Sequence, residues 1–345
     1  MYDIITIGSA TKDIFISSGQ LKKINDRNYL EKAGFVSGEA ICFPLGSKIN
    51  IEKPFATIGG RGVNTAVSFA KQGLKTASII SVGKDEEANK IIEIFKEDKI
   101  SVFPAISSKL ATAYSIVLIS KGGERTILTY RGALDNDNQF PKLLGDKKAR
   151  WAYFAPSDLN SPLTSKLISQ LYKNGILIAL NASRKLSSKD FKKIMPALKK
   201  VTVFILNREE ASCLTGLPFE DKKEIFKKID DAVGGIFIMT DGENGTLVSD
   251  NNSILEIGTF KTRPIDETGA GDAFGSGFIA GLIEKNEGCI SGKCKKDNLL
   301  YAIRLGSANA ASVVEHIGAT EGILSKIEFK CNKRWKSLPI KIHSI

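Results

Sequence analysis

The sequence predicts a doubly wound α/β domain built on a mostly parallel sheet. Three observations carry this prediction. Apolar runs of strand length recur along the chain, helix patterns alternate with them, and 345 residues suffice for one large domain over residues 1–345. The runs are nearly continuous, as in strands that are buried on both faces of a parallel sheet. Ligands of such a domain bind beyond the carboxyl ends of its strands.

Each element follows from this alternation. The expected strands cover residues 3–8, 76–83, 150–155, 175–181, 201–207 and 234–240. The expected helices cover residues 62–73, 85–98, 161–174, 187–200, 272–284 and 298–315. Trp151 begins one strand, and we expect it to pack in the core or at the sheet edge. We expect the last ~20 residues to be peripheral, because chain ends usually fray.

Two stretches interrupt the alternation, about residues 14–58 and 103–133. Both have irregular or alternating strand patterns with turns. Residues 112–133 read as a β-hairpin around the turn "KGGE". A small β-sheet formed by these insertions over the strand ends would be a lid that excludes water from a reaction.

Composition and charge exclude several function classes. The net charge is +11, but the lysines are scattered in pairs, with no basic stretch interleaved with aromatic residues. This favours a solvated surface that attracts anionic metabolites over a nucleic-acid-binding protein. The five cysteines are mostly isolated, and Cys289 and Cys294 lack a second pair for a zinc site. With no apolar run of about 20 residues and no signal peptide, we expect a cytoplasmic protein that does not bind membranes.

Residues 266–282, "DETGAGDAFGSGFIAGL", place glycines and an aspartate before an apolar helix. Gly269, Ala270 and Gly271 leave the backbone N–H groups accessible, and the helix dipole adds partial positive charge there. Asp272 among them suits a base that takes the proton of an alcohol attacking a phosphoryl group. A plain N-cap with glycines for helix packing fits the motif equally well.

Three further motifs have two interpretations each. "GGRGVNTAVSFAKQG" (59–73) opens a helix with glycines but fails G-x-G-x-x-G, and no P-loop pattern occurs anywhere. Asn207 and Glu210, three residues apart after a strand, suit a hydrated magnesium ion and a phosphate oxygen, or simply a capping box. "TDGENG" (240–245) is a turn for a ligand or a plain hairpin connection.

Together, residues 59–83 and 266–279 resemble the two signatures of the ribokinase-like (pfkB-type) carbohydrate kinases. "IGSATKD", "NREE", "TDGENG" and "IGATEG" follow in the order of that family, so the resemblance covers essentially residues 1–325. It implies a ribokinase-like fold with a β-sheet lid. It also implies phosphoryl transfer from ATP, with Mg²⁺, to a hydroxymethyl group of a sugar such as ribose or fructose.

The resemblance implies a role for each matching residue. Asp272 is the base, and its N–H group forms an anion hole with those of Gly269, Ala270 and Gly271. The sugar is bound by Asp13, Gly59, Gly60, Arg61, Asn64 and Asn160. The nucleotide is bound by Asn207, Thr240, Gly242, Gly245 and Ser307. Glu210 organises Mg²⁺ through water, and Asp266 with the carbonyl of Thr268 holds a monovalent cation such as K⁺.

Several positions leave this implication open. Glu267 adds a negative charge beside the expected cation loop. Arg61 stands where ribokinases carry lysine, and it would either meet a substrate phosphate or cap a loop. Asn160 lies near the place of a ribokinase glutamate, so ribose itself is not assured. The lid arginines Arg125 and Arg131 favour a sugar phosphate if both point inwards, and otherwise face solvent.

The acceptor therefore stays open. A sugar phosphate, as in phosphofructokinase-like or ribose-1-phosphate-kinase-like members, and a nucleoside such as adenosine are alternatives to the free sugar. ADP in place of ATP as donor is also open. A non-catalytic nucleotide- or sugar-binding pseudo-kinase is disfavoured, because Asp272, Asn207 and Glu210 are all present. The expected partners are the sugar or nucleoside, ATP, and a second copy joined through the sheet edges of the lid.

Overall fold

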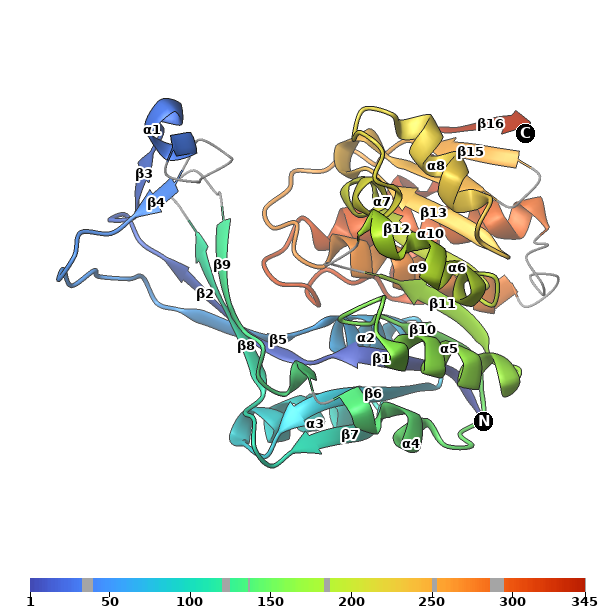
Figure 1. The fold of residues 1–345 in the computed structure, drawn as a ribbon, viewed down its shortest axis with the longest axis horizontal. Coiled ribbons are helices and arrows are strands. Elements are labelled where there is room, and N and C mark those ends of the chain that lie inside the picture. The colour runs from blue at the N-terminus through green and yellow to red at the C-terminus, as the bar shows by residue number, and fades with distance from the viewer. Residues whose placement is uncertain are drawn as a thin grey trace.

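The computed structural model describes residues 1–32, 40–119, 125–135, 137–182, 187–249, 253–285 and 295–344. A large sheet forms its centre (Figure 1). Its parallel strands are β1 (Tyr2–Ser9), β6 (Thr76–Gly83), β7 (Ser101–Ser107), β10 (Ala149–Phe154), β11 (Leu177–Asn181), β12 (Val203–Asn207) and β13 (Ile236–Thr240). Three antiparallel strands complete it: β14 (Thr246–Ser249), β15 (Ser253–Ile257) and β16 (Ile340–Ser344).

The strand order is β16-β15-β14-β13-β12-β11-β10-β1-β6-β7, ten strands in all. β1 pairs in parallel with β10 on one side and with β6 on the other. The chain therefore winds outwards in both directions from β1, which confirms the doubly wound, mostly parallel α/β class. All six predicted strands are present, each within two residues of the predicted ends.

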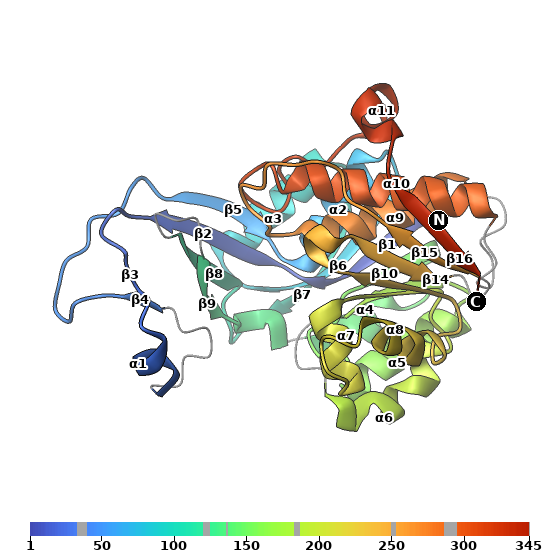
Figure 2. The same ribbon diagram turned by 90° about the horizontal axis from the view of Figure 1, so that it is seen from above.

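Helices cover both faces of this sheet (Figure 2). One face carries α2 (Arg61–Lys71), α3 (Glu86–Glu97), α9 (Ala270–Lys285), α10 (Lys296–Val313) and α11 (Lys326–Cys331). The other carries α4 (Phe140–Leu144), α5 (Pro162–Lys173), α6 (Ser188–Leu198), α7 (Arg208–Thr215) and α8 (Lys222–Asp230). In β1, Ile4 packs into the core under α9 and α10, whereas Ile5 and Ile7 pack into the core of the opposite face. No helix in the described ranges is long and apolar enough to span a membrane.

A second, four-stranded sheet extends from the large one (Figure 1). We call it the small sheet. Its strand order is β5 (Phe55–Gly59), β2 (Thr11–Ser17), β8 (Ala113–Ile119) and β9 (Arg125–Tyr130). β8 and β9 form the predicted hairpin, whose "KGGE" turn lies outside the described residues.

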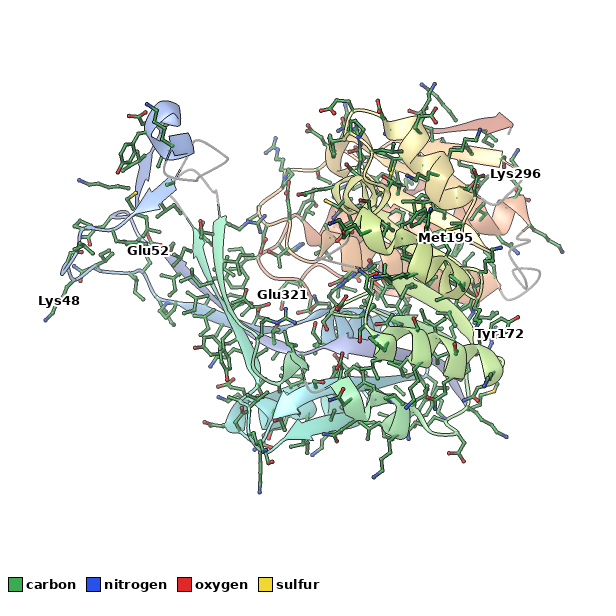
Figure 3. The ribbon with its side chains drawn as sticks, viewed as in Figure 1. Lys48, Glu52, Tyr172, Met195, Lys296 and Glu321 are labelled. Carbon is green, nitrogen blue, oxygen red and sulfur yellow. The ribbon has the colours of Figure 1, made fainter. Side chains whose placement is uncertain are left out.

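A segment with β3 (Lys22–Ile24), α1 (Arg27–Lys32) and β4 (Ala40–Cys42) projects beyond the small sheet and away from the large one (Figures 1 and 2). Lys48 and Glu52, both exposed, lie on the connection that returns from it (Figure 3).

Two expectations need correction. The predicted lid range 103–133 includes residues 103–107, which instead continue the large sheet, because β7 pairs with β6 along its whole length. Pro104 lies within this strand, and a proline argues against a strand inside a sheet. It is tolerated here because β7 is an edge strand. The C-terminal residues are not peripheral: β16 pairs with β15, and Trp335 is only 3% exposed. Its ring packs edge-on against Phe260, with centroids 5.1 Å apart. Trp151 is buried as expected.

Candidate active site

Asp272 lies in the first turn of α9, directly after a tight glycine turn. Gly269 has a φ of 78°, and a side chain there would collide with Ala319, so the turn requires glycine. At Gly271, by contrast, a side chain would meet no atom within 4 Å. The turn therefore packs tightly behind Gly269 and is open at Gly271.

The backbone amides of this turn are partly unengaged. The N–H of Ala270 donates to the carbonyl of Glu267 (3.2 Å), and that of Ala273 donates to Gly269 (2.8 Å). In the described part of the chain, the amides of Gly271 and Asp272 have no backbone acceptor. These two amides and the helix dipole can therefore bind an anion. The amide of Ala270, expected in the anion hole, is used by the turn itself.

The carboxylate of Asp272 is held by α2. Asn64 Nδ2 donates to Asp272 Oδ2 (3.0 Å), and Arg61 Nε donates to Oδ1 (3.2 Å). Asp272 is only 8% exposed. The start of α2 is fixed in turn, because the backbone N–H of Arg61 donates to Ser9 Oγ at the end of β1 (2.9 Å). The two glycine-rich motifs thus meet at one carboxylate, across 211 positions of sequence.

The same two side chains carry buried polar atoms that have no partner among the described residues: Arg61 Nη1 and Asn64 Oδ1. Arg61 Nη2 makes a long contact, 3.5 Å, to the carbonyl of Ala182. A buried donor or acceptor without a partner costs free energy. A ligand that offers an acceptor to Arg61 and a donor to Asn64 would remove this cost.

Behind Asp272 lies a fully buried tyrosine that the sequence pattern did not single out. Tyr153 of β10 is 0% exposed, and its hydroxyl accepts a hydrogen bond from Asn181 Nδ2 (2.7 Å). Gly275 of α9 packs directly on this hydroxyl, where a side chain would overlap it. Burial, and secondly the charge of Asp272, raise the pKa of Tyr153, so it stays a neutral support for α9.

A buried polar network also fixes α9 against α2 and α10. Ser276 Oγ lies 2.6 Å from the carbonyl oxygen of Asp272 and 2.7 Å from Ser68 Oγ of α2. Asn309 of α10 donates to the carbonyl of Ala273 (2.8 Å) and accepts from the N–H of Leu324 (3.0 Å). Polar residues among the buried positions of α9 and α10 were the available sequence signal for this network.

Asn207 and Glu210 form the capping box of α7. Asn207 Oδ1 accepts from the N–H of Glu210 (2.7 Å), and Glu210 Oε2 accepts from the N–H of Asn207 (2.9 Å). Burial raises the pKa of Glu210 most; Asp272 raises it further, while Arg61 lowers it. Glu210 therefore lies within electrostatic range of the Asp272 cluster. The helix-capping interpretation is correct, and the capping bond uses only one carboxylate oxygen of Glu210, Oε2.

Thr240 and the turn after it lie beside Asn207, because parallel pairing of β12 and β13 sets Asn207 opposite Thr240. Gly242 (φ 54°) faces open space, whereas a side chain at Gly245 (φ 86°) would overlap the carbonyl of Ile257. The turn thus connects β13 to β14 as a hairpin and presents an open glycine at the carboxyl edge of the sheet. Ser307 is half-buried in α10.

Asp13 is buried in β2 of the small sheet, 8% exposed, and Thr11 Oγ1 donates to its Oδ1 (3.1 Å). Burial raises the pKa of Asp13, against the lowering effect of the hydrogen bonds from Ser115 and Thr11. A side chain at Gly59 would overlap this carboxylate. The short segment 59–64, through the left-handed Gly60 (φ 91°), therefore touches Asp13 at one end and Asp272 at the other.

The remaining substrate residue, Asn160, lies in the connection from β10 to α5. Its backbone N–H donates to Asp158 Oδ1 (2.9 Å). β10 is a central strand of the large sheet, so Asn160 follows the same carboxyl edge as the other candidates.

Asp266, in the expected monovalent-cation loop, has several partners within the chain. Asp266, 4% exposed, accepts from the N–H of Thr268 (2.8 Å) and from that of Gly318 (2.9 Å). Arg125 of β9 forms an ion pair with the same carboxylate, and its Nη1 donates to Thr268 Oγ1 (2.8 Å). The Asp266 carboxylate, which was expected to bind K⁺, thus has a guanidinium group as its partner.

A magnesium ion fits this site only together with a phosphate. Within the described ranges, no three His, Cys, Asp or Glu side chains come together as a metal site. Mg²⁺ usually keeps several waters and binds through one or two carboxylates plus substrate phosphates. Glu210, a single carboxylate near Arg61 and Asp272, matches that mode.

Comparison with known proteins decides the family. The family model described as "pfkB family carbohydrate kinase" matches residues 30–326. The chain belongs to this family. It is thus a phosphotransferase with an alcohol group as acceptor.

Relatives of this pfkB-family kinase include two ribokinases. The ribokinase of Haemophilus influenzae is 27% identical over 279 residues, which is 78% of this chain and 85% of the relative. The ribokinase of Staphylococcus aureus is 25% identical over 335 residues, 93% of this chain and 96% of the relative. Identities of 25–27% do not identify the acceptor of this kinase.

Solved structures show the same fold. The ribokinase of Giardia lamblia has a TM-score of 0.74 at 20% identity, over 96% of this chain and 98% of that one. The nucleoside kinase of Methanocaldococcus jannaschii has a TM-score of 0.72 at 19% identity, over 97% and 98%. The pfkB-family kinase therefore has the ribokinase-like α/β fold, with its large sheet and its small separate sheet.

Proposed function

We propose that this kinase transfers the γ-phosphoryl group of ATP to a hydroxymethyl group of a sugar, with Asp272 as the general base. One observation carries the proposal. Both oxygens of Asp272 are held by Arg61 and Asn64, beside the unengaged amides of Gly271 and Asp272. A fixed proton acceptor next to an anion-binding turn is what phosphoryl transfer to an alcohol requires.

In the proposed step the acceptor hydroxyl gives its proton to Asp272 while its oxygen attacks the γ-phosphorus. The bond from that phosphorus to the bridging oxygen breaks, and ADP leaves. Negative charge on the transferring oxygens is met by the amides of Gly271 and Asp272, by the dipole of α9 and by Arg61. The role of Asp272 is supported by its position: it belongs to the same turn as these donors.

Magnesium, when bound, would neutralise charge on the nucleotide phosphates. Glu210 is the residue we propose to hold it, through water. Asn207, Thr240, Gly242, Gly245 and Ser307 are the proposed nucleotide contacts. The pairing of Asn207 with Thr240, and the open face of Gly242, support this placement.

The sugar is proposed to bind between Asp13 and Asp272. Asp13 accepts sugar hydroxyls there, and Gly59, Gly60 and Asn160 complete the cradle. Hydroxyl groups both donate and accept, so a free sugar can satisfy Arg61 Nη1 and Asn64 Oδ1 together. A sugar phosphate is the second candidate, because the guanidinium of Arg61 is a phosphate ligand. The phosphate group itself offers no donor to Asn64, so a hydroxyl of the same ligand would have to supply it.

The small sheet is proposed to act as the lid, and a second copy to pair along it. β9 is one of its two edge strands, and Ile127, Leu128 and Tyr130 are 44%, 52% and 39% exposed there. An exposed apolar edge strand favours pairing with another chain.

The test is a phosphoryl-transfer screen with ATP and Mg²⁺ against ribose, fructose, ribose 1-phosphate, fructose 1-phosphate, adenosine and cytidine. The proposal predicts turnover of a free sugar. Turnover of a sugar phosphate alone would move the assignment to the second candidate. Nucleotide binding without turnover of any acceptor would favour the pseudo-kinase.

A further inference from the structure

The loop that leads into α9 is tied to the small sheet by one arginine. Arg125 is the first residue of β9, and its side chain is 22% exposed. Its Nη1 pairs with the carboxylate of Asp266 and also donates to Thr268 Oγ1 (2.8 Å). Two separate groups of the loop are thus held by one guanidinium nitrogen.

Asp266 needs a positive partner at this place. Its side chain is 4% exposed, and an ionised carboxylate buried without a partner is strongly destabilising. The backbone N–H groups of Thr268 and Gly318 supply two hydrogen bonds but no full charge. Glu267 next to it is exposed and adds more negative charge. Among the described residues, Arg125 is the cation that pairs with Asp266.

The held loop continues directly into the proposed anion hole. Thr268 precedes Gly269, whose backbone is packed against Ala319. The N–H of Ala270 donates back to the carbonyl of Glu267. Any movement of residues 266–268 therefore moves the amides of Gly271 and Asp272.

We propose that Arg125 is a positioning residue that takes the place of a monovalent cation at Asp266, so that the anion-hole turn is held without K⁺. This inference rests on the proposed role of the Gly271–Asp272 turn. Because the guanidinium comes from β9, this contact holds the turn only when the small sheet lies against it. Arg125 thereby couples the position of the small sheet to the geometry at Asp272.

The experiment compares wild type with Arg125→Ala, Arg125→Lys and Thr126→Ala. Thr126 is the exposed next residue of β9 and serves as the matched control. Melting temperature and ADP affinity are measured in KCl and in choline chloride at equal ionic strength. Melting needs neither nucleotide nor turnover. A failure of the proposed function would instead appear as wild-type protein that binds no ADP.

The wild type, the Thr126→Ala variant and the Arg125→Lys variant should melt at the same temperature in both salts. Arg125→Ala should melt lower in choline than in KCl, because K⁺ can enter the vacated place. It should also bind ADP about tenfold more weakly in choline, a loss typical of one removed charge-assisted contact. The proposal is overturned if wild type itself is stabilised by K⁺ over choline, or if Arg125→Ala shows no difference between the salts.

Discussion

Asp272 accepts one hydrogen bond at each carboxylate oxygen, and both donors come from the first turn of α2. This pair of contacts orients the carboxylate without enclosing it, since Gly271 in front of it faces open space. Tyr153 and Ser276 hold the backbone of α9 from behind. At the scale of single residues, the site therefore consists of a fixed base, one cationic partner (Arg61) and neutral groups that support the backbone behind it.

Asp13 combines burial with a proposed ligand role, and this predicts a trade-off between stability and binding. The pKa of Asp13 is higher in the folded than in the unfolded protein. The contribution of Asp13 to stability is therefore fully present below its pKa in the unfolded protein, and is lost as pH rises through its pKa in the folded protein. At neutral pH, Asp13→Asn should therefore melt at a higher temperature than wild type, by a gap that narrows on acidification. Thermal melts over a pH series measure this.

The same variant should bind the acceptor more weakly, with a KM raised about 10- to 100-fold, the usual loss for a hydrogen bond to a charged group. A melting temperature at neutral pH below that of wild type would contradict the account of its burial. An unchanged KM would contradict its contact with the acceptor.

At the scale of elements, α9 is fixed by the helices around it. Asn309 of α10 bonds both to the carbonyl of Ala273 and to the N–H of Leu324. Ser68 of α2 lies within hydrogen-bond distance of Ser276 and Asn309. α2, α9 and α10 thus share one buried polar junction directly behind Asp272, which sets where the anion-binding turn points.

Removing the Asn309 side chain should destabilise the protein strongly. Asn309→Ala leaves the carbonyl of Ala273 and the N–H of Leu324 buried without that partner, which should lower the free energy of unfolding by about 2–4 kcal/mol. Urea unfolding measures this. Asn89→Ala, at an exposed position within α3, is the matched control and should change stability by no more than about 0.5 kcal/mol. Equal effects of the two substitutions would refute the junction.

The elements that were predictable are those with a strong local pattern. Apolar runs located the central strands, and two glycine-rich motifs located the starts of α2 and α9. Local sequence patterns did not predict features that depend on contacts between residues far apart in the chain. Pro104 disguised the edge strand β7, and the pairing of Arg125 with Asp266 joins positions 141 residues apart. Tyr153 looked like ordinary core, because nothing local shows that its hydroxyl meets Asn181 and Gly275.

At the scale of the whole molecule, the C-terminal segment completes both the large sheet and one of its cores. The antiparallel strands β14, β15 and β16 extend one edge of the large sheet, and β16 is its last strand. Trp335, between α11 and β16, is buried in the same core as α9 and α10. The C-terminal residues thus complete the core on the face of the sheet that carries Asp272.

Truncating this tryptophan tests that role. Trp335→Ala should lower the free energy of unfolding by about 3–5 kcal/mol, the usual cost of a large cavity in a core. Tyr172→Ala is the control, because Tyr172 is 57% exposed at the surface (Figure 3) and its loss should cost about 0.5 kcal/mol or less. Denaturant unfolding of both variants gives the comparison. A Trp335 variant as stable as the Tyr172 variant would restore the expectation of a peripheral tail.

The central claim is that Asp272 is the base of phosphoryl transfer, and Asp272→Asn tests it most directly, because the amide keeps the size of the side chain and removes its basicity. Turnover of the accepted sugar with ATP and Mg²⁺ is measured beside ADP affinity and melting temperature. The account predicts a kcat lowered by about 10²–10⁴-fold, the range of general base catalysis. ADP affinity should stay close to wild type, and the melting temperature should fall, because the amide keeps only one of the two acceptors for Arg61 and Asn64. A kcat equal to that of wild type in a folded, ADP-binding variant would contradict it.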